Sequence, residues 1–147
     1  MELEELVARE CIRDLVARYN SNGDSGRFAE VLALFAPDAV MDTDGDLHEG
    51  RDAIAAMFEA AAATVVAHGA GRRYIRHFTS TLQIDVLSPT SARGRCYYQV
   101  LTPEGLDHWG RYIDEYGVVD GRWAFTHRRE ILDGFVPGGW AAAATGG

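Results

Sequence analysis

Lysine is absent from this sequence, and every one of its 14 cationic residues is an arginine. Catalysis through a Schiff base on a lysine amine and phosphate binding by the lysine of a P-loop are therefore both excluded. Positive charge is also in the minority, because 22 acidic residues give a formal net charge of -8 at pH 7. Since proteins bind nucleic acids largely through clustered positive charge, we expect no nucleic-acid partner.

Long apolar runs are missing as well. No continuous apolar stretch approaches the roughly 18 residues that a membrane-spanning helix requires, so we expect no membrane partner. The first residues are acidic and follow a helical period, whereas a secretory signal has a basic segment followed by an apolar one. These features predict a cytoplasmic location. A length of 147 residues, without a linker or an internal repeat, predicts one domain over residues 1–147.

Cysteine and metal-binding motifs are also scarce. The two cysteines, Cys11 and Cys96, have neither CxxC spacing nor the number needed for a disulfide framework, so we expect both to be reduced and buried. The stretch "DTDGD" contains carboxylates like those of a calcium loop, but position 12 counted from Asp42 is Ala53 instead of glutamate. No nucleotide-binding, hydrolase or zinc-protease motif occurs. We therefore expect neither a metal nor a cofactor.

The first half of the chain has the period of helices. Apolar residues recur at helical intervals over residues 3–19, which predicts a first helix that ends near Asn20–Gly23. A second helix is predicted over residues 24–35 and ends at "PDA". A short strand with an Asp-Gly turn follows over residues 40–50, and an alanine-rich third helix over residues 51–69 closes at its final glycine.

The second half alternates with a period of two and predicts long strands. These strands cover residues 74–87, 91–101, 107–119 and 122–132. Three helices followed by an antiparallel meander predict the α+β class, with a curved, mostly antiparallel sheet wrapped around the helices as a cone. An apolar pocket is expected at the mouth of the cone. The tail, residues 136–147, is expected to be mobile unless Trp140 anchors it.

Three segments make the chain recognisable. The element order, "YNSNGDSGRFAEVLALFAPDAV", "RHFTS" and "DGRWAFTHRRE" together resemble the SnoaL-like branch of the NTF2-like superfamily. The resemblance covers nearly the whole chain and is nearest to the group of scytalone dehydratase, bile-acid dehydratase and hexachlorocyclohexane dehydrochlorinase. It implies the NTF2-like cone fold. It also implies that an aspartate just after the first helix, here Asp24, pairs with a strand histidine, here His77, and that Tyr19 is the active-site tyrosine five residues before the aspartate.

These residue types suit an elimination reaction. A histidine such as His77 can remove a carbon-bound proton at neutral pH, and a carboxylate such as Asp24 on its other ring nitrogen fixes the tautomer. The Tyr19 phenol can polarise a carbonyl or protonate a leaving hydroxyl, and an arginine can hold developing negative charge. By strand alternation Arg129 shares a face with Phe125 and is preferred to its neighbour for that role. Residues predicted to bind substrate are His108, Tyr112, Phe125 and His127.

Each candidate also has a purely structural explanation. Asp24 could cap the second helix, and His77 lies on the more polar of two alternating faces, which could be the solvent side. Tyr19 could be a core residue of the first helix. Arg129 could form a surface ion pair with Glu130 or Asp133.

Three functions follow from these alternatives. The leading hypothesis is a cofactor-independent lyase of the dehydratase type that acts on a hydrophobic cyclic or polyketide-like small molecule. The second is a polyketide cyclase or isomerase of the same fold. The third is a non-catalytic protein that binds a small molecule, and it predicts no hydrogen bond between Asp24 and His77. Apolar strand faces further suggest a homodimer or a homotrimer.

Overall fold

The computed structural model describes residues 1–68 and 74–146 and contains one six-stranded curved sheet. The strand order is β2-β1-β6-β5-β4-β3. β1 runs parallel to β6, and all other neighbouring strands are antiparallel. The strands are β1 (Phe35–Thr43), β2 (Asp46–Glu49), β3 (Arg76–Ser88), β4 (Ser91–Thr102), β5 (Gly105–Val119) and β6 (Arg122–Phe135).

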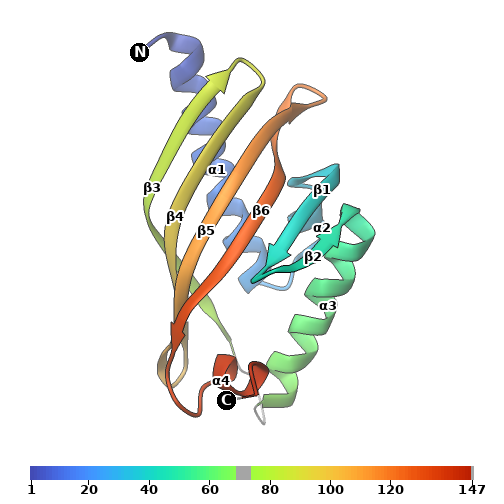
Figure 1. The fold of residues 1–147 in the computed structure, drawn as a ribbon, viewed down its shortest axis with the longest axis vertical. Helices are drawn as coiled ribbons and strands as arrows, with labels where there is room; N and C mark the ends of the chain where they lie inside the picture. The colour runs from blue at the N-terminus through green and yellow to red at the C-terminus, as the bar shows by residue number, and fades with distance from the viewer. Residues whose placement is uncertain (69–73, 147) are drawn as a thin grey trace.

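Helices cover one side of this sheet, as Figure 1 shows. The described helices are α1 (Leu3–Asp24), α2 (Phe28–Leu32), α3 (Gly50–His68) and α4 (Trp140–Ala144). α1 runs behind the long strands, α3 lies beside β1 and β2, and α4 packs near the end of α3 (Figure 1). This arrangement is the predicted α+β cone of the NTF2-like type, which is thereby confirmed.

The spacing of apolar residues explains how α1 packs on the sheet. Ile12, Leu15, Val16 and Tyr19 are buried and recur three or four residues apart, so they form one stripe along the helix. This stripe belongs to the main hydrophobic core together with inward residues of the strands. Cys96 is buried as predicted, but the prediction for Cys11 is wrong, because Cys11 lies on the exposed side of α1.

The second helix is shorter than predicted because strand pairing begins inside the predicted helical segment. Phe35 already pairs with Phe125 of β6, and the backbone N–H of Phe125 donates to the carbonyl of Leu34. β1 passes through Pro37, which β1 accommodates because its pairing with β6 is irregular between Phe35 and Val40. Helix α3 ends its described course at His68, and the predicted closing glycine, Gly69, lies outside the described residues.

Shifts in the pairing register interrupt the alternation of inward and outward residues along the long strands. Three of these shifts are β-bulges that change which residues face the inner side of the sheet. On β3 the register shifts between Ser80 and Gln83, where Thr81 has a φ of 57°. On β5 one extra residue, Asp107, lies between the pairs that β5 makes with β4, and on β6 Thr126 is the extra residue opposite β5. Each bulge reverses which side of the strand the following residues face.

The bulge on β6 corrects the prediction for Arg129. Counting alternate residues from Phe125 predicts that Arg129 points inward, but the extra residue Thr126 moves Arg128 to the inner face instead. Arg128 is fully buried, whereas the side chain of Arg129 is 50% exposed and lies 3.5 Å from Asp42. The structure therefore favours the surface-pair explanation for Arg129, but the partner is Asp42 instead of Glu130 or Asp133.

The tail is anchored through Trp140. Its indole Nε1 donates to the hydroxyl of Thr64 on α3, and its backbone N–H donates to the carboxylate of Asp107 on β5. Residues 140–144 form the short helix α4, which the sequence pattern did not predict. Within the described part of the chain, no helix combines the length and apolar character needed to cross a bilayer.

Candidate active site

A cavity of about 330 Å³ lies between α1, α3 and the inner face of the sheet. Its walls are mostly apolar, with side chains from both helices. Polar groups converge on it from α1 and from several elements of the second half of the chain. The described polar and aromatic lining comprises Tyr19, Asn20, Asp24, Phe28, Phe58, Tyr74, His77, His108, Tyr112, Glu130 and Trp140.

Asp24 and His77 form the pair that the family resemblance implied. Asp24 Oδ1 lies 2.6 Å from His77 Nδ1, and the backbone N–H of His77 donates to Asp24 Oδ2 over 2.9 Å. The aspartate thus fixes both the ring and the backbone of the histidine. Because a carboxylate only accepts hydrogen bonds, Nδ1 carries the proton and Nε2 is the free base of the neutral ring.

The capping explanation for Asp24 does not hold. Asp24 is the last residue of α1, and the N-cap position of α2 is Arg27, which makes no side-chain capping bond. Gly26, with a φ of 72°, turns the chain between the two helices and leaves the Asp24 carboxylate directed to β3. The bulge at Thr81 similarly explains the ambiguous face of His77, because it places His77 on the inner side together with Ile84.

Tyr19 belongs both to the aromatic core and to the cavity wall. Its ring makes edge contacts with Phe35, Tyr112 and Phe125, and it lines the cavity with Tyr112. Burial raises the pKa of the Tyr19 phenol, and the Arg128 guanidinium opposes this shift without cancelling it. Burial likewise raises the pKa of Tyr112. Both phenols are therefore protonated at neutral pH and can donate hydrogen bonds.

Arg128 lies beneath these two tyrosines. Its guanidinium carbon is 4.2 Å from the ring centre of Tyr19 and 3.9 Å from that of Tyr112. Nε and Nη2 donate to the Asp114 carboxylate over 2.8 and 3.0 Å, while Nη1 has no hydrogen-bond partner among the described residues. Burial opposes the charge on Arg128, but the Asp114 carboxylate outweighs it and raises the pKa of the guanidinium. Arg128 is thus a fixed cation behind the cavity wall.

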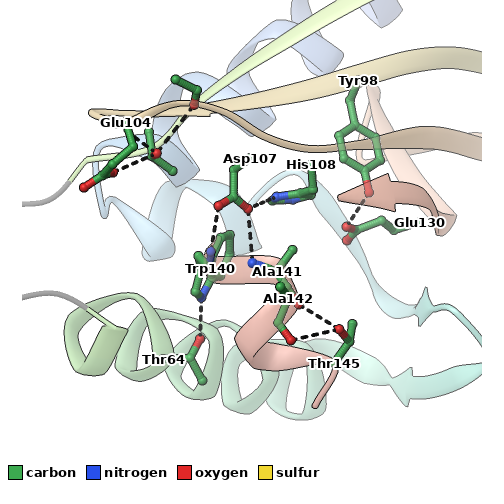
Figure 2. A network of polar contacts seen from close by, with 12 residues as sticks. Thr64, Tyr98, Glu104, Asp107, His108, Glu130, Trp140, Ala141, Ala142 and Thr145 are labelled. Atoms are coloured by element: carbon green, nitrogen blue, oxygen red, sulfur yellow. Dashed lines mark hydrogen bonds and ion pairs between the residues drawn. The ribbon is translucent and has the colours of Figure 1, made fainter. Parts of the chain in front are cut away.

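His108 lines the same cavity and has its own carboxylate partner, as Figure 2 shows. His108 Nδ1 lies 2.7 Å from Oδ2 of the adjacent Asp107. Nearby, the Tyr98 hydroxyl donates to Glu130 Oε1 over 3.0 Å, and Glu130 also lines the cavity. The sequence predicted His108 as a binding residue, but Asp107 and Glu130 were missed. The sequence "DH", two polar residues in consecutive positions of a predicted strand, could have indicated a role for Asp107 beside His108.

Asn20 is a further lining residue that sequence reasoning missed. It is buried, and its side-chain Nδ2 has no hydrogen-bond partner among the described residues. Asn20 precedes Asp24 by four residues, so the two side chains lie on the same face of α1. That spacing was a readable signal. An unpaired buried amide donor beside a cavity is suited to a carbonyl oxygen of a ligand.

Other predicted site residues lie elsewhere. Phe125 is fully buried in the core, and neither Phe125 nor His127 is part of the described cavity lining. Their prediction as substrate contacts is therefore not supported by position. Phe125 packs in the core against Tyr19 and Arg128, and His127 follows the bulge at Thr126 and alternates with the inward Arg128. Across residues 1–68 and 74–146, no three His, Cys, Asp or Glu side chains form a cluster that could hold a metal ion.

The chemistry available in this cavity is proton transfer. Nε2 of His77 is a base held in one orientation, and a second histidine stands in the same apolar enclosure. Phenol and amide donors can stabilise an enolate-like oxygen. These are the groups that an elimination or an isomerisation next to a carbonyl requires.

Comparison with known proteins gives one family match. The model of the SnoaL-like domain family matches residues 4–129, which is most of the chain. A search among curated proteins found no match.

Several solved structures share the fold. A protein from Novosphingobium aromaticivorans, provisionally designated a scytalone dehydratase, has 24% identity and a TM-score of 0.79, with 92% of this chain and 91% of that chain covered. The hexachlorocyclohexane dehydrochlorinase LinA-type3 of Novosphingobium barchaimii has 20% identity and a TM-score of 0.77, with 93% and 94% covered. A Mycobacterium tuberculosis protein of unknown function has 25% identity and a TM-score of 0.78, with 97% and 87% covered.

Proposed function

This chain belongs to the SnoaL-like domain family, and we propose that it is a cofactor-independent lyase of the dehydratase type. Its structural neighbours include the dehydrochlorinase and the provisionally designated dehydratase described above. The observation that carries the proposal is the double contact of Asp24 with the ring and the backbone of His77, at the wall of an apolar cavity.

His77 is the base in this proposal. Its neutral Nε2 removes a proton from the carbon next to a carbonyl group, and the Asp24 carboxylate stabilises the imidazolium that forms. Buried charge pairs of this kind strengthen in an apolar enclosure because little water screens them. The binding-protein hypothesis predicted no such hydrogen bond, so the Asp24–His77 contact speaks against it.

The cavity indicates the kind of substrate. Its volume of about 330 Å³ lies near the lower end of the ~300–1,000 Å³ range of ligand pockets. Apart from its histidines, the charged groups of the described lining are the carboxylates of Asp24 and Glu130, which would repel an anionic substrate. The substrate is therefore a neutral, mainly apolar molecule of one or two rings that carries a hydroxyl group in the β position to a carbonyl.

Three further residues support the reaction in this proposal. The Asn20 amide and the Tyr19 phenol donate to the substrate carbonyl, whose oxygen gains negative charge as the proton leaves. Arg128, behind Tyr19, takes over the electrostatic role that strand alternation predicted for Arg129. It acts through the tyrosine ring and the local potential, because it does not line the cavity.

The test is an elimination assay with variants of the pair. The probe is the aldol adduct of benzaldehyde and acetone, a neutral β-hydroxy ketone whose dehydration gives benzylideneacetone and raises the near-ultraviolet absorbance. We expect turnover by the wild-type protein and a loss of about a hundredfold to ten-thousandfold in His77→Gln and Asp24→Asn, which is the range of general acid–base catalysis. His48→Gln, on β2 outside the cavity lining, is the matched control and retains full activity.

Mass spectrometry of the product separates the outcomes. Loss of one water from the probe supports a dehydratase, whereas conversion without a change of mass supports the isomerase or cyclase alternative. Turnover that persists unchanged in His77→Gln would contradict the assignment of His77 as the base. Tight binding of the probe without any conversion would favour the non-catalytic alternative.

A further inference from the structure

The Asp107 carboxylate has three hydrogen-bond partners, His108 beside it on β5 and Trp140 and Ala141 at the start of α4. Its Oδ2 lies 2.7 Å from His108 Nδ1 and also accepts the backbone N–H of Ala141, while its Oδ1 accepts the backbone N–H of Trp140 over 2.7 Å. Figure 2 shows this carboxylate between the His108 ring and the start of α4. The same group therefore orients a cavity histidine and fixes the segment whose Trp140 lines the cavity.

The β5 bulge makes this arrangement possible. Val100 of β4 pairs with His108 and Leu101 pairs with Leu106, so Asp107 is the extra residue. Consecutive strand residues normally face opposite sides, but here both Asp107 and His108 are buried. A bulge at this point is thus required for a neighbouring aspartate to reach its own histidine on the inner face.

His108 lies at the opposite side of Tyr98 from His77. The Tyr98 ring centre is 6.2 Å from that of His77 and 6.0 Å from that of His108. The His108 ring also contacts Trp140, with 5.4 Å between centres. His108 also borders a neighbouring hollow of about 450 Å³ between α3, α4 and β6. It can therefore contact a ligand in the main cavity and exchange protons on a second side.

We propose that His108 is the general acid that protonates the leaving hydroxyl, and that Asp107 is its positioning residue, coupled to the docking of α4. This inference rests on the proposed lyase function. With Nδ1 directed to Asp107, Nε2 of the imidazolium is the atom that donates the proton. The cavity then has two aspartate–histidine pairs with different roles. His77 is the base that removes the proton, and His108 is the acid that protonates the leaving hydroxyl.

The proposed step is balanced. His77 Nε2 takes the proton from the carbon next to the carbonyl, and the electron pair of that C–H bond becomes the new C=C bond. The C–O bond to the hydroxyl breaks, its electron pair stays on oxygen, and the His108 proton completes a water molecule. His77 is then charged and His108 neutral, and exchange with solvent after product release restores both rings.

The charged surroundings of His108 favour this role. Asp107 of β5 contacts the ring directly, Glu130 of β6 lines the same two cavities, and the Tyr98 phenol of β4 packs beside it. From α4 and α3, Trp140 and Thr64 contribute neutral groups. Burial raises the pKa of the Asp107 carboxyl, but the hydrogen bonds from His108 and α4 outweigh burial, so this pKa is lowered. The Asp107 carboxylate therefore accepts a hydrogen bond from His108 Nδ1 and leaves Nε2 directed away from it.

The experiment compares two leaving groups. Hydroxide requires a proton to leave, whereas chloride does not, so a general acid matters only for the first. The probes are the aldol adduct of benzaldehyde and acetone and its β-chloro analogue, both of which give benzylideneacetone, with the buffer rate subtracted. We expect His108→Gln and Asp107→Asn to lose at least about tenfold to a hundredfold more rate with the hydroxyl probe than with the chloro probe.

Two controls make the result specific. His77→Gln is expected to lower the rate with both probes, because both eliminations need the base. Asp133→Asn, on the exposed side of β6, is expected to leave both rates unchanged.

Three results would overturn the inference. Equal losses with both probes in His108→Gln would mean a structural or binding role for His108, and unchanged rates with both would mean no role. Either leaves the lyase proposal intact when His77→Gln is inactive. No turnover of either probe by the wild-type protein would instead contradict the proposed lyase function, and with it the role of His108.

Discussion

Arg128 and Arg129 are neighbours in the sequence but have opposite environments. Arg128 is fully enclosed, with Asp114 and three aromatic rings around its guanidinium. Arg129 points to the outer side of the sheet, where solvent screens its contact with Asp42. A buried charge depends on its partner far more than an exposed one does. Replacing Arg128 should therefore change the free energy of unfolding more than replacing Arg129.

We expect Arg128→Met to lower the free energy of unfolding by about 3 to 5 kcal/mol, because Asp114 then remains as a buried, uncompensated charge. Arg129→Met should change it by less than about 0.5 kcal/mol, as is typical of exposed sites. Urea denaturation followed by circular dichroism measures both values. The double variant Arg128→Met/Asp114→Leu should recover much of the loss, since neither charge is then left unpaired. Equal effects of the two single substitutions would contradict the assigned orientations.

At the scale of secondary-structure elements, bulges decide which side chains reach the cavity. The bulges on β3, β5 and β6 bring His77, Asp107 and Arg128, respectively, to the inner side of the sheet. Strict alternation of inward and outward residues would predict the wrong face for residues beside each bulge. A bulge interrupts the regular hydrogen bonds between two strands, and bulges are common next to active sites. The bulge on β3 also requires Thr81, a β-branched residue, to adopt a positive φ.

The strain at Thr81 is testable by glycine substitution. A φ of 57° costs an L-residue roughly 1–2 kcal/mol, whereas glycine adopts it freely. We therefore expect Thr81→Gly to leave the free energy of unfolding unchanged or to raise it by up to about 1 kcal/mol. Thr79→Gly, on the same strand with ordinary backbone geometry, should lower it by roughly 0.5–1 kcal/mol. Thermal or urea unfolding of both variants provides the comparison, and a larger loss at Thr81 would rule out the bulge.

At the scale of the whole molecule, the outer face of the sheet carries large exposed apolar side chains. Tyr97 of β4, and Trp109 and Ile113 of β5, are between 38% and 54% exposed and lie on the side away from the helices. Large apolar side chains exposed on one face of a sheet are found at interaction sites. We propose that this face joins copies of the chain in a homodimer or a homotrimer.

Light scattering coupled to size-exclusion chromatography tests this assembly. We expect a mass of two or three times the 16.1 kDa of one chain. Tyr97→Asp combined with Ile113→Asp should shift the mass to that of a monomer, because two buried charges would face each other across the interface. Leu47→Asp replaces a similarly exposed apolar residue on β2 and should leave the assembly unchanged. A monomeric wild-type protein would contradict the proposal.

The sequence by itself determined the fold class and the order of the elements apart from β2 and α4, which it did not predict as separate elements. Helical spacing in the first half and alternation in the second are local patterns, and they predicted the α+β cone correctly. The resemblance to the SnoaL-like branch implied the pairing of Asp24 with His77 and the place of Tyr19 beside them, and all three residues line the cavity. The absence of lysine excludes Schiff-base and P-loop chemistry whatever the fold, because both need an amine that this chain does not have.

Only the tertiary structure decided which of two neighbouring residues faces the cavity and which contacts it makes. The choice of Arg128 over Arg129, the reach of Asp107 to His108, and the docking of α4 all depend on bulges. A bulge arises where the hydrogen-bond register of one strand must fit both the adjacent strand and the helices on its face. That fit involves residues distant in the sequence, so no local pattern contains it, and a shift of one residue is enough to exchange the inner and outer faces.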